Sequence, residues 1–408
     1  MRRIVFFIVL GMAYLNARSQ NIVLQGVLTD SETGEPVSYA HIGICGRSIG
    51  TVSNESGTYN FYIPDYMRND TLCASAIGYE TFRVPISAIQ SLLAYNIRLV
   101  PQIHQLGEVI IRDQRITARR VIERAINRIS RNYPRTPHFL EGYYRDYLRR
   151  DNEYISFLEG AFVVEDPGFR KPVSQSKVKI LQLRHNRQYL ENFDRYIYKL
   201  GEDSTRLLLH GIMPSFEGNE FSNMMYHDPI RNHSISVPFV GLFDDFWNRN
   251  YNFKISYYTV VDGAEVYVID VAPSEGFRFT HVDIRGRLFI RTDNYAIVKF
   301  SYAYFVTKRL ETKKLYEINL EYRDVGGVMY LKYISFMNYF KIMTLTEIAD
   351  LYFFREFFVN NIVTSPPDEA LVVPFIDPQK PLYLQGAPND PAFWISYNRV
   401  LLEQPLLD

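Results

Sequence analysis

The feature that most constrains the fold is a series of short segments in which apolar and polar residues alternate. Such segments run over residues 23–28, 37–45 and 59–63, and turn-forming residues separate them, as in 54–57. Period-two alternation is typical of strands with one buried face, and closely spaced turns join antiparallel strands. Residues 20–112 are therefore predicted to form an antiparallel β-sandwich of about seven strands. The other strands are predicted over 71–77, 81–86, 96–100 and 108–111.

A second series of longer alternating segments follows, joined by turns such as Asp262-Gly263 and 324–327. The chain has 31 Tyr and 28 Phe against 2 Trp, and such rings suit half-buried strands. This pattern predicts a larger antiparallel meander, which must curl or be covered to hide its apolar face. Its strands are predicted over 139–148, 153–164, 178–183, 252–261, 265–272, 281–290, 295–305, 314–323 and 328–336. Residues 203–210 are predicted as a short helix, and 239–249 as an aromatic helix or loop.

Between these two series the apolar period changes from two to 3.6, which predicts one amphipathic helix over residues 114–131. Asp113 is the predicted N-terminal cap, and Asn132-Tyr-Pro134 ends the helix. One face is rich in arginine, but Glu123 interrupts it, so we interpret it as a solvated face rather than a membrane surface. The apolar face carries Ala118, Val121, Ile122, Ala125, Ile126 and Ile129.

The first quarter of the chain contains Gly26-Val-Leu-Thr-Asp30, Thr33-Gly-Glu-Pro36, the run from Gly50 to Phe61, and Ile77-Gly-Tyr-Glu80. This string resembles the carboxypeptidase-like regulatory domain, a transthyretin-like fold found at the front of envelope proteins of Gram-negative bacteria. The resemblance implies an accessory sandwich without chemistry of its own. The resemblance does not imply a catalytic zinc site, because no peptidase domain is recognised in the chain.

The segment 286–298, with Asp293-Asn294 followed by Tyr295-Ala-Ile297, looks like part of the curved half-barrels that carry lipoproteins or lipids. Similar secreted proteins also share Glu141-Gly-Tyr-Tyr-Arg145 and the tail Asp390-Pro-Ala-Phe-Trp394 with Tyr397-Asn398. The resemblance implies a half-barrel-like second domain. The expected fold is mainly β: a transthyretin-like sandwich, a linking helix, and a larger curved antiparallel sheet with a few helices.

The N-terminus has the three parts of a secretory signal: Arg2-Arg3, the apolar run 4–10, and the small residues Ala17 and Ser19. We expect a signal peptide over 1–19, cleavage before Gln20, and a mature protein in the periplasm or associated with the outer membrane. No later stretch approaches the ~18 apolar residues of a transmembrane span, and no cysteine near the cleavage site suggests a lipid anchor. The expected layout is 1–19, 20–112, 113–365, and a tail over 366–408 that packs on the second domain.

Charge content excludes one class of partner, and the two cysteines leave two structural roles open. The chain has 45 basic and 45 acidic residues without a long basic run, which excludes a nucleic-acid footprint. Cys45 and Cys73, both in the sandwich, either form a disulfide in an oxidising compartment or serve as small apolar fillers.

Motifs for catalysis or cofactors are weak. Gly46-Arg-Ser48-Ile-Gly50 fits a nucleophile elbow, but Ser48 lies in a turn between predicted strands rather than before a helix. The carboxylate pairs Glu165-Asp166 and Asp244-Asp245 are interpreted as solvated or capping groups. The eight histidines lack the spacing of a zinc site, and no phosphate-binding motif occurs, so no catalytic, metal or cofactor-binding residue is predicted. These histidines are His41, His104, His138, His185, His210, His227, His233 and His281.

Three functions remain open from the sequence. The first is a non-enzymatic envelope protein that binds or scaffolds an unidentified envelope partner. The second is a periplasmic carrier of a lipophilic ligand, if the aromatic residues line a curved groove instead of packing against the 114–131 helix. The third is a hydrolase with an unfamiliar site, which a cleft gathering Asp244, Asp245, His227 and His233 would favour.

Overall fold

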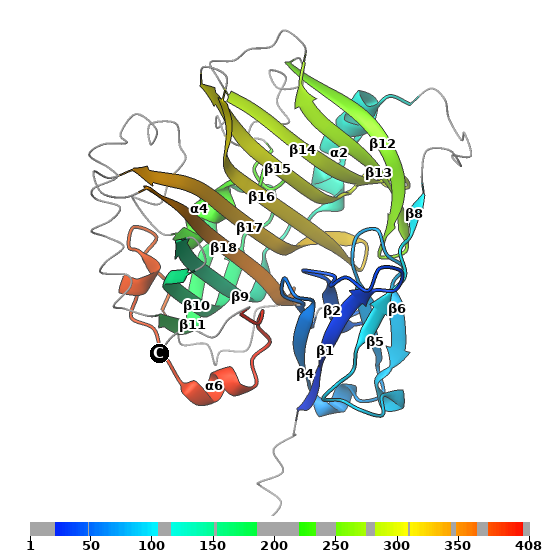
Figure 1. Ribbon diagram of the computed structural model, residues 1–408, viewed down its shortest axis with the longest axis vertical. Coiled ribbons are helices and arrows are strands. Elements are labelled where there is room, and N and C mark those ends of the chain that lie inside the picture. The colour runs from blue at the N-terminus through cyan, green and yellow to red at the C-terminus, as the bar shows by residue number, and fades with distance from the viewer. Residues whose placement is uncertain are drawn as a thin grey trace, which may run out of the picture.

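The computed structural model is mainly β, with a small sandwich below a large curved sheet (Figure 1). In the described part of the chain, α2 (Ala118–Asn132), α4 (Glu220–Tyr226) and α6 (Pro391–Ile395) are the α-helices, and none is long and apolar enough to cross a membrane. The structure describes residues 21–47, 49–104, 116–150, 153–185, 220–233, 250–274, 282–308, 311–343, 348–364 and 374–402.

The predicted sandwich is confirmed as two small sheets with the strand orders β4-β1-β7 and β3-β2-β5-β6. It is not wholly antiparallel as predicted, because β1 pairs with β7 in parallel. Inward-facing residues of both sheets, such as Leu24, Ile42 and Phe61, are fully buried in one core. The predicted strand over 108–111 lies outside the described residues. The strands are β1 (Ile22–Asp30), β2 (His41–Ile44), β3 (Gly50–Val52), β4 (Thr58–Ile63), β5 (Thr71–Ser75), β6 (Phe82–Pro85) and β7 (Ile97–Leu99).

A disulfide joins Cys45 and Cys73, whose Cα atoms lie 5.2 Å apart. Cys45 follows β2 directly and Cys73 lies in the paired strand β5. The backbone N–H of Cys45 also donates to the carbonyl of Thr71 at 2.9 Å. The cross-link therefore fixes the end of a hydrogen-bonded strand pair.

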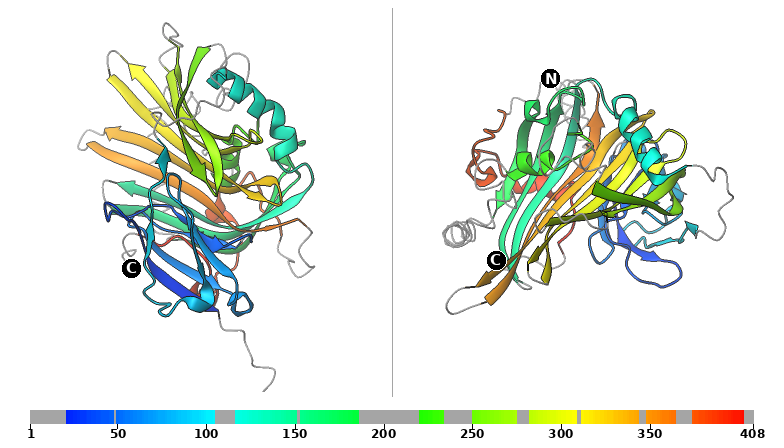
Figure 2. Two further views of the ribbon diagram at one scale, coloured as in Figure 1. Left: turned by 90° about the vertical axis from the view of Figure 1, so that its right-hand side faces the viewer. Right: turned by 90° about the horizontal axis from the view of Figure 1, so that it is seen from above.

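The predicted meander is confirmed as part of one eleven-stranded sheet in the order β11-β10-β9-β18-β17-β16-β15-β14-β13-β12-β8. The sheet is curved and open (Figure 2). Strand β18, which was not predicted, pairs with both β17 and β9 and joins the two predicted groups. The strands are β8 (Ile103–His104), β9 (His138–Arg150), β10 (Glu153–Asp166), β11 (Lys177–His185), β12 (Tyr251–Val261), β13 (Ala264–Pro273), β14 (Val282–Arg291), β15 (Ile297–Lys308), β16 (Glu311–Val325), β17 (Val328–Met343) and β18 (Ile348–Val363).

Helix α2 begins at Ala118, later than predicted, with Thr117 as its N-terminal cap; the predicted cap Asp113 lies outside the described residues. The Thr117 hydroxyl accepts from the N–H of Arg120 at 3.3 Å. The apolar stripe is buried as expected, with Val121 and Ile129 fully covered by the sheet's core. Three arginines of the opposite helix face place their guanidinium groups over aromatic rings of the second domain. Arg119 lies over Phe253, and Arg124 and Arg128 lie over Tyr295.

The large sheet has two different faces. One, the helix face, packs against α2 and α4 and carries apolar residues such as Tyr144, Phe336 and Phe357. The opposite, sandwich face carries the next residue along each strand, such as Arg145 and Glu356, because side chains alternate along a strand. The sandwich and the tail cover part of this second face.

The C-terminal segment 374–402 contacts both β structures. At the sheet edge the N–H of Ile376 donates to the carbonyl of Val178 at 2.8 Å. At the sandwich edge the side-chain amide of Asn398 bonds both backbone groups of Tyr62, at 2.8 Å and 3.1 Å. Between these ends, Trp394 of α6 is buried at the junction of sandwich and sheet.

Candidate functional site

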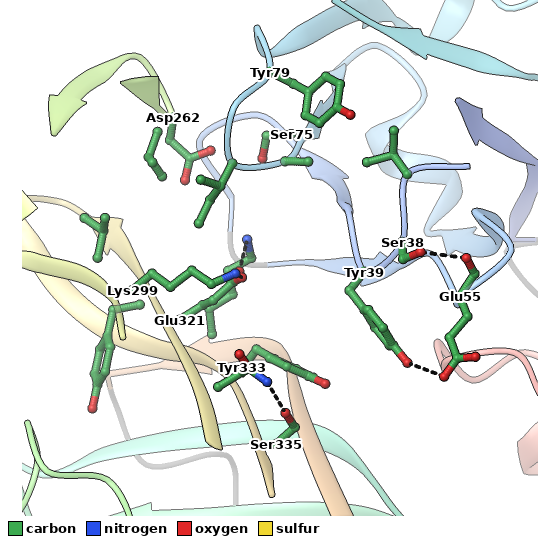
Figure 3. A pocket seen from close by; sticks show the side chains of 18 of the residues that line it. Ser38, Tyr39, Glu55, Ser75, Tyr79, Asp262, Lys299, Glu321, Tyr333 and Ser335 are labelled. Atoms are coloured by element: carbon green, nitrogen blue, oxygen red, sulfur yellow. Dashed lines mark hydrogen bonds and ion pairs between the residues drawn. The ribbon is translucent and has the colours of Figure 1, made fainter. Parts of the chain in front are cut away.

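The strongest candidate site is a cavity of about 450 Å³ between the sandwich and the sandwich face of the large sheet (Figure 3). The sandwich contributes the 37–39 segment, Glu55, residues 75–77 at the end of β5, and Tyr79. The sheet contributes side chains from β15 to β18, and the β12–β13 turn contributes Asp262. The cavity therefore exists only because the sandwich is docked on the sheet.

A row of polar residues crosses the sheet and passes under this cavity. Its members are direct cross-strand partners on ten consecutive strands, and Ser335 and Asn319 are the two that line the cavity. Cross-strand neighbours of this kind lie close enough to pair. The row is Arg184, Glu159, Arg145, Glu356, Ser335, Asn319, Ser301, Arg287, Asp270 and Lys254.

One wall of the cavity is an ionic triad. The Glu321 carboxylate accepts from Lys299 at 2.9 Å and from Lys332 at 3.2 Å. Burial alone would raise the pKa of Glu321, but the two lysines outweigh it and lower the pKa to about 2. Glu321 is thus ionised and fixed in position at neutral pH.

A β-bulge makes this triad possible. Glu321 pairs with Tyr333 and Tyr322 pairs with Leu331, which leaves Lys332 as the extra residue of β17. An extra residue interrupts the regular alternation of side chains between the two faces. Lys332 therefore reaches Glu321 although its neighbour Tyr333 also lines the cavity.

The sandwich side of the cavity holds Tyr39 in an unusual backbone conformation, with φ at 55°. This left-handed region is costly for a bulky residue and persists only where the surroundings enforce it. Here the Tyr39 hydroxyl donates to Glu55 at 3.2 Å, and the adjacent Ser38 hydroxyl donates to the Glu55 carbonyl at 2.6 Å. Burial, followed by the nearby carboxylates of Glu356 and Glu55, raises the pKa of Tyr39, so its hydroxyl stays protonated.

A buried ion pair lies beside the cavity. Arg145 and Glu356 approach to 2.5 Å, and both side chains are almost completely excluded from solvent. The Tyr333 hydroxyl donates to the second Glu356 oxygen at 2.8 Å. This network orients the Tyr333 ring, which forms part of the cavity wall.

The predicted candidate residues of the 227–233 loop have structural roles. The His227 ring packs on Phe336 at 4.7 Å, its Nδ1 is 2.8 Å from the Asn223 carbonyl, and burial lowers its pKa to about 4. Nδ1 of His233 is 3.0 Å from the Ile230 carbonyl. Asp228 accepts from the N–H groups of Ile230 and Arg231 and from Tyr322.

The remaining sequence candidates form no catalytic grouping within the described residues. Asp166 makes a buried ion pair with Arg231 at 3.1 Å, while Glu165 belongs to the β10–β11 ladder. Ser48, Asp244 and Asp245 lie outside the described residues. Across the residues that the structure describes, no three histidine, cysteine or acidic side chains are grouped to hold a metal ion.

The cavity residues were missed because they are polar positions on strands, which single-strand patterns assign to solvent. Lysine and glutamate do interrupt both faces of the 314–323 segment. That interruption was the available signal, but it does not say that the sandwich covers Glu321. The partner surface comes from a segment more than 200 residues away along the chain.

On the helix face, Glu220 at the start of α4 is a second perturbed carboxyl. Its Oε2 accepts from the N–H of Leu382 at 2.9 Å. Burial, followed by the nearby Asp146, raises its pKa to about 7. The folded protein therefore retains this proton well above the pH at which an unfolded chain releases it.

Glu220→Gln should remove a pH dependence of stability. With a folded pKa of about 7 and a lower unfolded value, the wild type loses stability as pH rises from about 4.5 to about 7. We expect the variant to gain about 1–3 kcal/mol relative to wild type between pH 5 and pH 8. Urea unfolding at both pH values measures this, since groups such as His227 contribute equally to both proteins. The exposed Glu123→Gln is the control, and equal slopes for both variants would contradict the assignment.

Comparison with known proteins identifies the sandwich. The CarboxypepD_reg-like domain family matches residues 24–111, in agreement with the resemblance of the sequence to that domain. No curated protein matches the chain.

Two solved structures overlap with the chain. A DUF1329 family protein from Desulfovibrio piger has 8% identity and a TM-score of 0.24, covering 62% of this chain and 95% of its own. The MucA/MucB complex of Pseudomonas aeruginosa contains a chain with 9% identity and a TM-score of 0.18, covering 58% of this chain and 93% of its own. TM-scores this low carry no argument about function, so the curved sheet is interpreted from its own strands.

Proposed function

We propose that this chain is an exported, non-enzymatic protein of the cell envelope that binds a small ligand in the cavity between sandwich and sheet. The observation that carries the proposal is the convergence of side chains from both β structures on one cavity of about 450 Å³. This volume lies in the range of small-molecule sites, which also use a few fixed polar groups among rings and apolar side chains.

The state of the charged groups favours binding over catalysis. Glu321 is held ionised by two lysines, with its pKa lowered to about 2, whereas a general base or acid needs a pKa near the operating pH. The same pairing fixes the positions of three side chains before a ligand arrives. Fixed groups lower the entropic cost of binding.

A carrier function for a lipophilic ligand has less support. It requires an open apolar groove on the helix face, but Val121, Ile122, Ala125 and Ile129 of α2 pack into the apolar core on that face. Phe221 of α4 fills a neighbouring part, with its ring 5.0 Å from that of Phe357. The interface cavity is therefore the better candidate for a ligand.

The export part of the proposal depends on the signal-peptide pattern of residues 1–19. N-terminal sequencing of the protein from fractionated cells should begin at Gln20, because Ala17 and Ser19 provide the small residues that signal peptidase requires. A full-length protein in the cytosol would contradict export without affecting the cavity.

The binding part is tested by filling the cavity. We expect the wild type, incubated with the small-molecule fraction of a Gram-negative envelope extract, to retain a compound detectable by native mass spectrometry. Asn319→Trp should abolish retention, because the indole occupies the cavity floor. Asn127→Trp, on the exposed side of α2, is the matched control and should retain the compound. Retention by the Asn319→Trp variant, or by neither the wild type nor the control, argues against this site.

A further inference from the structure

We infer that the cavity is built for an uncharged, polyhydroxylated ligand, of which a mono- or disaccharide is the simplest class. This inference rests on the proposed function, since it names the ligand of the same cavity. It follows from the charge balance between the lining and the cations beside it, from the neutral polar groups of the floor, and from the tyrosine rings of the walls.

The first step is charge. Four carboxylates line the cavity, and lysine or arginine side chains lie beside three of them. Glu321 bonds both Lys299 and Lys332, and Glu317 bonds Lys314 at 2.7 Å. Burial lowers the pKa of Arg323 to about 10, and the nearby Asp262 opposes this shift. The lining itself holds two cations, Lys299 and Lys332, and two more, Lys314 and Arg323, lie beside it, so four cations in or next to the cavity balance its four carboxylates. A ligand therefore needs no net charge to balance this site.

The second step is the floor. Ser335 and Asn319 present a hydroxyl and an amide where the polar row passes under the cavity. The two hydrogen bonds that Asn319 donates, to Ser335 and to Glu317, are both 3.4 Å long. Such lengths are at the weak end for N–H···O bonds, so a ligand hydroxyl can replace them at little cost.

The third step is the wall. Figure 3 shows Ser38 and Tyr39 on the sandwich side and Tyr333 on the sheet side of the cavity. The ring centroids of Tyr39 and Tyr333 lie 6.4 Å apart and are tilted by 31°. Tyrosine rings offer apolar surface to the C–H groups of a ligand. A saccharide presents such C–H surface together with hydroxyls that both donate and accept.

The ionic triad supplies the remaining hydrogen bonds. Lys299 and Lys332 can each donate to a ligand hydroxyl while they remain bonded to Glu321, because an ammonium group has three donors. Charged partners make hydrogen bonds stronger than neutral ones. The site should therefore discriminate against a ligand without hydroxyls, because such a ligand would exclude solvent from the two ammonium groups without replacing the lost hydrogen bonds.

The experiment is titration calorimetry with glucose, N-acetylglucosamine and cellobiose, supported by an array of uncharged saccharides, with spermidine and citrate as charged probes. At least one neutral saccharide should bind with the same Kd at about 50 mM and about 500 mM NaCl, since no charge is screened. Asn319→Leu should weaken that binding roughly 3–10-fold, the effect of losing one or two neutral hydrogen bonds. Asn127→Leu on α2 is the control and should bind as wild type does.

The outcomes separate the inference from the function on which it rests. Binding of spermidine or citrate alone, no binding of any neutral saccharide, or a Kd unchanged by Asn319→Leu overturns the assignment of the ligand class. If an envelope compound is still retained by wild type and lost with Asn319→Trp, the cavity remains a binding site for another class. If nothing is retained and no saccharide binds, the proposed function fails as well.

Discussion

Glu356→Ala should lower the free energy of unfolding by about 3–5 kcal/mol, the cost of leaving one member of a buried ion pair without its partner. Glu356 is fully buried, and it pairs with Arg145 at 2.5 Å and accepts from Tyr333 at 2.8 Å. The variant leaves the Arg145 guanidinium in the interior without its carboxylate. Urea or guanidinium unfolding followed by circular dichroism measures the change.

Two further variants test the cause of this loss. The double variant Glu356→Leu with Arg145→Met should recover much of the stability, because replacing both charges with apolar groups is often neutral. Arg68→Ala breaks the exposed pair with Asp65 and should cost less than about 1 kcal/mol. A loss below about 1 kcal/mol for Glu356→Ala would mean that the pair is hydrated and not buried.

Trp394→Ala should cost about 3–5 kcal/mol, in the range for removing a buried tryptophan. The indole packs with Val52 of the sandwich and with Tyr143 and Phe358 of the sheet, and Arg184 lies 4.7 Å above its ring. The variant therefore removes the side chain that both β structures share. Unfolding should also become less cooperative, because the sandwich loses part of its attachment.

The neighbouring Ile395→Ala is the matched control. Ile395 is 70% exposed on the same helix, so its truncation should change stability by less than about 0.5 kcal/mol. Hydrogen exchange gives a second readout, since the Tyr62 N–H donates to Asn398 at 2.8 Å. That amide should exchange faster in Trp394→Ala than in Ile395→Ala. Equal exchange and equal stability of the two variants would show that α6 does not hold the sandwich.

The fold class was predictable because alternation and turn residues are local signals. The hairpin at Asp262-Gly263, for example, follows from two residues that both accept positive φ, at 49° and 81°. Strand β18 was not predictable in the same way, because both of its faces are covered and Phe353, Phe354, Phe357 and Phe358 are all buried. Apolar residues in adjacent pairs, here separated by Arg355 and Glu356, give no period-two signal.

The candidate site was less predictable than the fold. Glu321 and Lys332 face each other only because of a bulge, and a bulge leaves no mark in the residue types of a single strand. Tyr39 reaches the same cavity from a turn of the sandwich, more than 200 residues earlier in the chain. Loop histidines and carboxylate pairs were candidates because of their chemistry. In the structure, however, Asp228 and His227 bond backbone groups of their own loop.

The two hydrogen bonds between the Asn398 side chain and the Tyr62 backbone bear on the behaviour of the protein in concentrated solution. Strand β4 is the outer strand of its small sheet, and an outer strand with free N–H and C=O groups is a template for pairing with another chain. The Asn398 amide satisfies one donor and one acceptor of that edge in the manner of a neighbouring strand. We therefore expect the tail to limit aggregation through β4, and a protein cleaved before Asn398 to self-associate through an edge that the intact chain keeps occupied.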